Sequence, residues 1–366
     1  MTRKIAFYLP QFHPVAENDA FWGKGFTEWT NVTKAKPLYK GHRQPFLPSD
    51  LGFYDLRLPE ARQAQTELAK QAGIEGFCYW HYWFGGGKKV LDRILHEVLV
   101  SGEPDFPFCL AWANQSWTGK WHGLNNEVLF KQAYPGIEDI RNFFYDTLPA
   151  FKDRRYLKVD GKPLFLIYQP NEVPDTYPLI PVWRDLAKKE GINDIFFVGN
   201  DPQVGQFSRL ASELDGHAQN GVKEAQYYAS FSCDCSLNQR IIKRITKLNN
   251  KFFRQDQPIV FDYENYVRNY MSESSLHSDL FPTIIPGWDN TPRSRGRGVV
   301  FERESPVLFK ELLIYLHSRL QCRSQDRQII FLKSWNEWAE GNVLEPSERW
   351  GSQYLDAIRE SSKFCT

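Results

Sequence analysis

Short runs of apolar residues alternate with longer amphipathic segments along most of this sequence. Strand-length apolar runs stand at seven places: Ile5–Leu9, Gly76–Trp83, Phe106–Trp112, Leu164–Tyr168, Ile195–Val198, Thr283–Ile285 and Gln328–Leu332. An eighth strand is expected near Asp215–Ala218. Apolar residues recur three and four positions apart, as in a helix, over Pro59–Gln71, Val90–Val100, Glu138–Phe151, Pro181–Glu190 and Pro306–Leu320. This alternation predicts a parallel sheet whose strands are joined by crossover helices.

Polar and aromatic side chains gather where almost every predicted strand ends. They are Tyr8, Gln11, His13, Tyr79, His81, Tyr82, Trp112, Asn114, Trp117, Trp288, Asp289, Asn290, Trp335, Asn336 and Trp338. Barrel enzymes build their sites from the loops after all the strands, whereas an open sheet concentrates ligand groups at one switch point. The sequence therefore predicts an α/β fold of the (β/α)8 TIM-barrel type, with long loops over its C-terminal face and these side chains as substrate contacts.

The barrel is expected to form one catalytic domain over residues 1–366. Residues 219–280 are harder to assign and are expected to hold an insertion or a lid. The connection Asn18–Asp50, rich in Trp, Gly and Pro, is expected to be a packed loop over the barrel mouth. Within it, Trp22, Glu28 and Trp29 form either a sugar platform or loop packing, and packing is slightly favoured. His13 and His81 are equally compatible with sugar contacts and with structural roles.

Two glutamates after the last predicted strand are the best candidates for catalysis. Glu337 and Glu340 stand three residues apart between tryptophans. Glycosidic chemistry needs one carboxyl to protonate the leaving oxygen and a second to act as base or nucleophile. If the segment is helical, the two side chains share a face, with Cβ atoms about 5–6 Å apart. That distance is close to the carboxyl separation of about 5–5.5 Å in retaining enzymes. The alternative is a helix start that favours acidic residues.

Composition narrows the class of protein. Lys and Arg number 45 against 44 Asp and Glu, and this balance disfavours a nucleic-acid partner. No apolar run approaches the roughly 20 residues of a membrane span, and no secretory signal is recognised, so we expect a cytoplasmic protein. The six cysteines lack metal-ligand spacing. No P-loop or Rossmann glycine pattern is present. We therefore expect neither a metal nor a cofactor.

Several segments resemble one protein family over nearly the whole chain. The segments Tyr8–Pro14, Trp22–Trp29, Gly52–Leu56, Gly76–Trp83, Trp112–Asn114 and Pro286–Thr291 closely resemble WbsX-like proteins, which occur in bacterial surface-polysaccharide biosynthesis and are labelled glycosyltransferases. That family is in turn similar to the endo-α-1,2-mannosidases of glycoside hydrolase family 99, which are (β/α)8 barrels. Their Glu-Trp-x-Glu element is matched by Glu337–Glu340. The resemblance implies that Glu337 deprotonates the sugar 2-hydroxyl, giving an anhydro-sugar, and that Glu340 is acid and then base, with net retention.

The sequence departs from the family pattern at two positions, and an Arg-rich segment suggests a sugar donor that carries phosphate. Gln115 and His122 stand where WbsX-like proteins usually carry acidic residues, which indicates an altered specificity or activity. The Arg-rich segment Arg293–Arg297 follows the seventh strand, where barrels often bind phosphate, although a solvated loop is the alternative.

Three functions follow from these observations. The first is a glycosidase-like enzyme with retaining chemistry on a mannose-like glycan of a bacterial polysaccharide. The second is a glycosyltransferase that uses an activated sugar donor in O-antigen or polysaccharide biosynthesis. The third is a non-catalytic glycan-binding barrel. The expected partner is a glycan or a glycosylated lipid, together with an association with a polysaccharide-assembly system.

Overall fold

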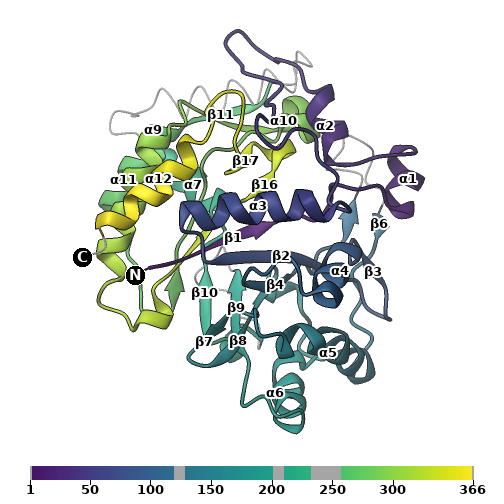
Figure 1. The fold of residues 1–366 in the computed structure, drawn as a ribbon. Helices are drawn as coiled ribbons and strands as arrows, with labels where there is room; N and C mark the ends of the chain where they lie inside the picture. Colours follow the sequence, from purple (N-terminus) through teal and green to yellow (C-terminus); the bar gives the residue numbers. More distant parts are fainter. Residues whose placement is uncertain (1, 119–127, 201–209, 232–256, 365–366) are drawn as a thin grey trace.

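The chain forms a closed parallel β-barrel surrounded by helices (Figure 1). The computed structural model describes residues 2–118, 128–200, 210–231 and 257–364. In these residues the barrel strands are β1 (Arg3–Tyr8), β2 (Gly76–Trp83), β4 (Phe108–Trp112), β8 (Lys162–Ile167), β9 (Phe196–Asn200), β10 (Gly216–Ala218), β12 (Leu280–Phe281), β13 (Thr283–Ile284) and β15 (Ile329–Leu332). Neighbouring barrel strands pair in parallel throughout. The predicted (β/α)8 barrel is confirmed.

The seventh barrel strand is divided at Pro282. β12 pairs with β10 on one side and β13 pairs with β15 on the other, so the two segments together close the ring. Proline has no N–H to donate, but the Pro282 carbonyl accepts a hydrogen bond of 2.9 Å from the Phe331 amide. The described residues thus supply eight strand positions, and β10 is the eighth strand expected near Asp215–Ala218.

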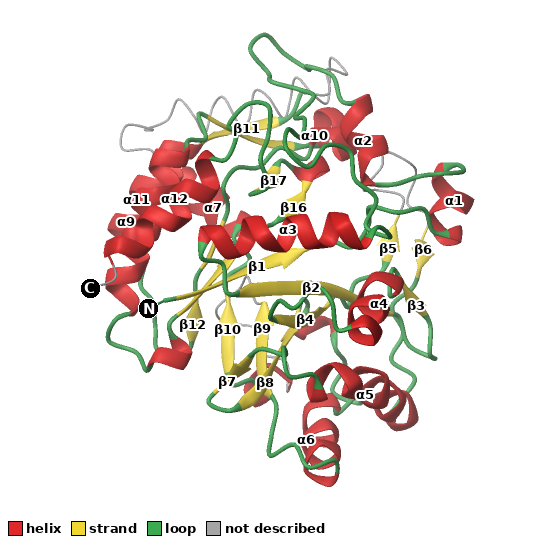
Figure 2. Cartoon of the chain, viewed as in Figure 1, coloured by secondary structure: helices red, strands yellow, loops and turns green. Residues whose placement is uncertain are grey.

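The crossover helices lie on the outside of the barrel (Figure 2). They are α3 (Pro59–Ala72), α4 (Arg93–Ser101), α5 (Ile137–Lys152), α6 (Leu179–Lys189), α7 (Val222–Ala229), α9 (Tyr263–Glu273), α11 (Pro306–Leu320) and α12 (Gln353–Ser361). α3 begins at a proline and ends at Gly73, whose φ of 78° suits glycine. Four of the five predicted helices agree to within two residues. The fifth, expected from Val90, begins at Arg93 because Lys89–Val90 forms β3 against β2.

The loops over the C-terminal face of the barrel carry short elements of their own. The first of these loops contains α1 (Ala16–Trp22) and α2 (Glu28–Lys34), where a continuous packed loop was expected. Others hold β5 (Trp117–Thr118) against β6 (Val128–Phe130), β11 (Ile259–Asp262) against β14 (Val299–Glu302), and β16 (Asn336–Glu337) against β17 (Asn342–Val343). The short helix α10 (Thr291–Ser294) follows the seventh strand, and β7 (Lys158–Val159) pairs with β8.

The segment 219–280 contributes to the barrel itself. Its helix α9 buries Tyr263, Tyr266 and Tyr270 completely, so α9 is an ordinary crossover helix between β10 and β12. Residues 232–256 lie outside the described part of the chain. A lid in this segment therefore stays a prediction. Among the helices of the described ranges, none is both long and apolar enough to cross a bilayer.

Candidate active site

A cavity of about 340 Å³ opens at the C-terminal ends of the barrel strands, and it contains both predicted catalytic glutamates. We call it the glutamate cavity. Its walls come from most of the strand ends and from α1 and α2. They are formed by Leu9, Gln11, Asn18, Trp22, Glu28, Trp80, Tyr82, Ala113, Gln115, Ser116, Trp117, Leu129, Tyr168, Asn220, Val222, Lys223, Gln226, Trp288, Asn290, Arg293, Lys333, Glu337 and Glu340. Aromatic walls with a few convergent polar groups are typical of a small-ligand site.

The pleat of the strands decides which predicted residues reach this cavity. Successive side chains in a strand point to opposite faces, so Trp80 and Tyr82 of β2 line the cavity while the alternate positions do not. His81, for example, is buried and stacks on Phe143 of α5 with the ring centroids 5.7 Å apart. Of the predicted site residues, the cavity brings together Gln11, Tyr82, Trp117, Trp288, Asn290, Glu337 and Glu340.

The other predicted contacts are buried outside the glutamate cavity: Tyr8, His13, Tyr79, His81, Trp112, Asn114, Trp335, Asn336 and Trp338, together with the half-buried Asp289. Several of them fasten loops to the barrel. Asn336 accepts a hydrogen bond from the Leu9 amide at 2.7 Å and donates to the Leu9 carbonyl at 3.0 Å. Asn114 makes the same double contact with the backbone of Gln169. Their polar groups hold backbone near the site, so a substrate is not needed to explain them.

Glu337 is fixed in place by two neutral donors. The indole N–H of Trp80 donates to Oε1 at 2.8 Å, and the amide of Asn342 donates to Oε2 at 2.7 Å. Glu337 is only 6% exposed and ends β16. Both oxygens of Glu337 accept hydrogen bonds, so its carboxyl is held in one orientation in the cavity.

Glu340 lies in a different electrostatic setting. Its Oε1 accepts a hydrogen bond of 2.6 Å from Arg293, which also donates to Glu28 Oε1 at 2.5 Å. Burial raises the pKa of Glu340 to about 7, Arg293 pulls that pKa down, and the carboxylate of Glu337 pushes it up. Arg293 thus forms ion pairs with two carboxylates at once. With its raised pKa, Glu340 carries a proton over part of the neutral pH range. A buried carboxyl with a raised pKa, beside a second carboxyl, is the pattern expected of a general acid.

Lys333 is a site residue that the sequence prediction missed. It follows β15 directly and its side chain enters the cavity, with Nζ 5.9 Å from the ring centre of Trp80 and 5.8 Å from that of Tyr168. Burial works against its charge, but Tyr168 and both glutamates raise the pKa of Lys333. The sequence feature that could have identified Lys333 is its position directly after the last strand, one residue before Ser334. Trp80 and Asn18 were also absent from the predicted contacts. Of the three residues left open between a sugar platform and loop packing, Trp22 and Glu28 line the cavity, whereas Trp29 is buried outside it.

The local structure around the glutamates differs from the helix that the spacing suggested. Glu337 belongs to β16 with ψ of 68°, and a 3₁₀ turn covers only Trp338–Glu340. The amide of Ala339 in this turn donates to Glu28 Oε1 at 3.1 Å. The two carboxyls share one cavity because the chain turns between them. The carboxyl-to-carboxyl distance of about 5–5.5 Å that is typical of retaining enzymes stays a prediction for Glu337 and Glu340.

The Arg-rich segment does not gather its three guanidinium groups. Arg293 points into the glutamate cavity and is paired with two carboxylates, while Arg295 and Arg297 are exposed. A phosphate bound by all three arginines therefore has no support from their placement. Of the two family departures, Gln115 lines the cavity, and His122 lies outside the described residues.

Comparison with known proteins gives a family match and a shared fold. Residues 4–358 match the family described as Glycosyltransferase WbsX. Two relatives from strains of Xanthomonas campestris pv. campestris, each described as an uncharacterized protein WxcX, are 36% identical over 358 residues. These residues are 98% of this chain and 49% of each relative, so the chain spans about half the length of these relatives.

Solved structures with a similar fold include a carbohydrate enzyme. One is the family 99 endo-α-mannosidase of Bacteroides thetaiotaomicron, with a TM-score of 0.56 and 15% identity over 99% of this chain and 95% of that one. Another is described as a glycoside hydrolase-like protein, with a TM-score of 0.59 and 16% identity over 98% of this chain and 93% of that one. At these identities the likeness concerns the fold.

Proposed function

The chain belongs to the Glycosyltransferase WbsX family, and from that premise we propose that it is a carbohydrate-active enzyme that cleaves or transfers a glycosyl group through Glu337 and Glu340. The observation that carries this proposal is the pair of buried carboxyls in one aromatic-walled cavity, held in different electrostatic settings. The preferred substrate is a mannose-like glycan of a bacterial surface polysaccharide, supported by the fold shared with an endo-α-mannosidase.

The proposed chemistry follows the roles that the resemblance implied. Glu340 protonates the glycosidic oxygen while the bond from that oxygen to the anomeric carbon breaks. Glu337 removes the proton of the sugar 2-hydroxyl, whose oxygen closes on the anomeric carbon to give an anhydro-sugar. An acceptor hydroxyl, from water or from a second sugar, then opens this ring as Glu340 takes its proton and Glu337 returns a proton to the 2-oxygen. The anomeric configuration is retained overall.

The geometry supports this division of labour. Arg293 binds Oε1 of Glu340, and no donor among the described residues is assigned to Oε2, so that oxygen is free to carry the proton. The two N–H groups that donate to Glu337 fix the orientation of its carboxyl in the cavity, and the proposed base is therefore held in one position. Trp80, Tyr82, Trp117 and Trp288 offer flat apolar faces for the C–H faces of a sugar ring.

A glycosyltransferase is the second candidate, favoured by the family's description and by the cations of the cavity. Lys333 and Lys223 line it with Arg293, and cations of this kind stabilise a departing phosphate. Incubation with mannosyl fluoride separates the two candidates. A hydrolase releases fluoride in water alone, whereas a transferase needs an acceptor saccharide and yields a longer glycan.

The decisive experiment is a crystal soak with a mannose-configured imino-sugar, combined with turnover of a panel of glycosyl fluorides. We expect the ring to lie between Glu337 and Glu340. We expect Glu340→Gln to abolish most turnover even of the fluorides, because the second step needs Glu340 as the base for the acceptor hydroxyl. Full turnover by Glu340→Gln on the best substrate would remove the basis of the proposal. Saturable binding with no bond cleavage across the panel would favour the non-catalytic alternative.

A further inference from the structure

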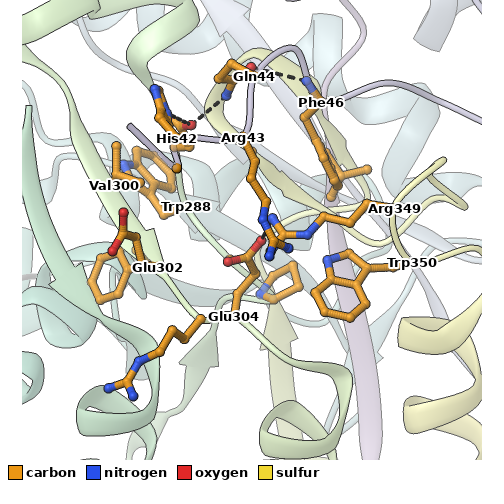
Figure 3. A pocket seen from close by; sticks show the side chains of 18 of the residues that line it. His42, Arg43, Gln44, Phe46, Trp288, Val300, Glu302, Glu304, Arg349 and Trp350 are labelled. Carbon is orange, nitrogen blue, oxygen red and sulfur yellow. Dashed lines mark hydrogen bonds and ion pairs between the residues drawn. The ribbon is translucent and has the colours of Figure 1, made fainter. Parts of the chain in front are cut away.

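A second cavity, of about 310 Å³, lies next to the glutamate cavity. We call it the arginine cavity. Figure 3 shows its walls, which come from the loop 39–46, from β14 with the residues after it, and from Arg349 and Trp350. The sequence prediction did not identify it. Trp288 lines both cavities, and the amide of Asp289 donates to the Glu340 carbonyl at 2.7 Å.

The loop that forms one wall is fixed to the barrel. Oδ2 of Asp289 accepts hydrogen bonds from His42 at 2.8 Å and from Gln44 at 2.6 Å. Its Oδ1 accepts from the amide and hydroxyl of Thr291. These four contacts satisfy the carboxylate, which was expected to touch substrate. Because Asp289 holds the loop, Arg43 between His42 and Gln44 projects from a defined backbone position.

Two guanidinium groups meet at one carboxylate in this cavity. Arg349 forms an ion pair with Glu304 and lies over the ring of Trp350, with Cζ 4.9 Å from the ring centre. Arg43 extends toward the same carboxylate (Figure 3), yet no acid among the described residues is paired with it. Glu302 lies on the opposite side of the cavity. Close positive charges that share a single acid favour an additional anion.

The aromatic side chains of Trp288 and Trp350 also line this cavity. Flat aromatic walls and convergent guanidinium groups together match a ligand that has both a sugar ring and a negative charge.

We propose that the arginine cavity binds a saccharide that carries an anionic group, a carboxylate or a phosphate, with Arg43 and Arg349 holding the anion and Trp288 and Trp350 contacting the ring. The anion is supplied either by an acidic sugar of a glycan or by a sugar phosphate. This site is separate from the glutamates and does not depend on the proposed catalytic function.

Calorimetric titration of the full chain carrying Glu340→Gln tests the proposal, since binding is then measured without the proposed acid. The probes are hexuronates, the hexose 1-phosphates with the same rings, the neutral hexoses and inorganic phosphate. We expect one anionic class to bind about tenfold more tightly than its neutral hexose, because a charge-assisted hydrogen bond contributes on this scale. Hexuronate binding would identify an acidic glycan as the source, and hexose phosphate binding an activated sugar.

Arg43→Gln assigns the site, because Arg43 is exposed and unpaired and its loss should leave the fold intact. We expect it to raise the Kd of the anionic saccharide about tenfold. Arg297→Gln, an exposed arginine that lines neither cavity, is the matched control and should change nothing. Equal effects of the two variants would overturn the proposal. So would neutral hexoses, or inorganic phosphate, binding as tightly as the anionic sugars.

Discussion

At the scale of single residues, the protonation of Glu340 controls the proposed reaction. Its pKa of about 7 means that the acid form is lost as the pH rises through neutrality. A general acid must be protonated to act, so we expect kcat/KM to fall above about pH 7. Glu340→Gln should lower turnover of poorly activated substrates by about 10²–10⁴-fold. Its residual rate should also lack the alkaline fall. A variant that keeps this fall would assign it to another group.

Lys333 gives a second test at this scale, in which the alkaline fall of kcat/KM is expected to move rather than to disappear. Its positive charge is one of the influences that lower the pKa of Glu340. Lys333→Met should therefore raise that pKa and move the alkaline fall of kcat/KM to higher pH. Lys223→Met, at another cation of the same cavity, is the control for a general loss of positive charge. If Lys333→Met and Lys223→Met move the pH profile of kcat/KM equally, Lys333 has no particular effect on Glu340.

At the scale of secondary-structure elements, α2 joins the first loop to the 3₁₀ turn that carries Glu340. Glu28 at its start accepts the Ala339 amide and binds Arg293, and its charge also raises the pKa of Glu340. Glu28→Gln removes that charge, so that of these two carboxylates Glu340 alone still forms an ion pair with Arg293. We expect the alkaline fall of kcat/KM to move to lower pH, contrary to the shift for Lys333→Met. Glu60→Gln, on the exposed side of α3, should leave the pH profile in place.

The tight approach of two loops can be tested at Gly341, which ends the 3₁₀ turn Trp338–Glu340. Its φ is 67°, and a Cβ there would lie 2.8 Å from the Asp289 amide nitrogen. Gly351 has a φ of 50° but open space around its Cβ position. Both alanine variants incur left-handed backbone strain of about 1–2 kcal/mol, and Gly341→Ala adds the clash. Urea unfolding should show the greater loss of stability for Gly341→Ala. Equal losses would mean that the two loops move apart easily.

The elements also show how far the sequence could predict the site. Alternation of strands and helices was enough for the barrel, because each strand contributes an apolar run and each crossover helix an apolar face. The pleat was not used, so His81 was chosen for its chemistry although alternation places Trp80 and Tyr82 in the cavity. Lys333 and Arg293 enter the site through loops that the strand pattern does not describe. Helices α1 and α2 have seven residues each, too short for a helical period to show.

At the scale of the whole molecule, the barrel is closed by contacts between the two ends of the chain. β1 lies between β2 and β15, and Nζ of Lys4 in β1 donates to the hydroxyl of Ser362 at 2.8 Å. The site depends on this closure, because Glu337 and Glu340 follow β15, while Glu28 follows β1 and Trp80 lies in β2. Residue patterns predict the strands separately, but only the closed ring brings these groups into one cavity.

The C-terminal helix gives a test of this closure. α12 packs on α3 and α11 and buries Tyr354, Leu355 and Ile358. Burying each such side chain contributes about 1.5–3 kcal/mol, and the sum is comparable to the whole stability of a typical domain. A chain that ends at Ser352 should therefore be insoluble or lack a cooperative thermal transition. Arg359→Gln, on the exposed side of the same helix, should melt like the unaltered chain. A truncated chain that still melts cooperatively and binds the imino-sugar would show that the barrel closes without α12, and that the glutamate cavity is held by the strands alone.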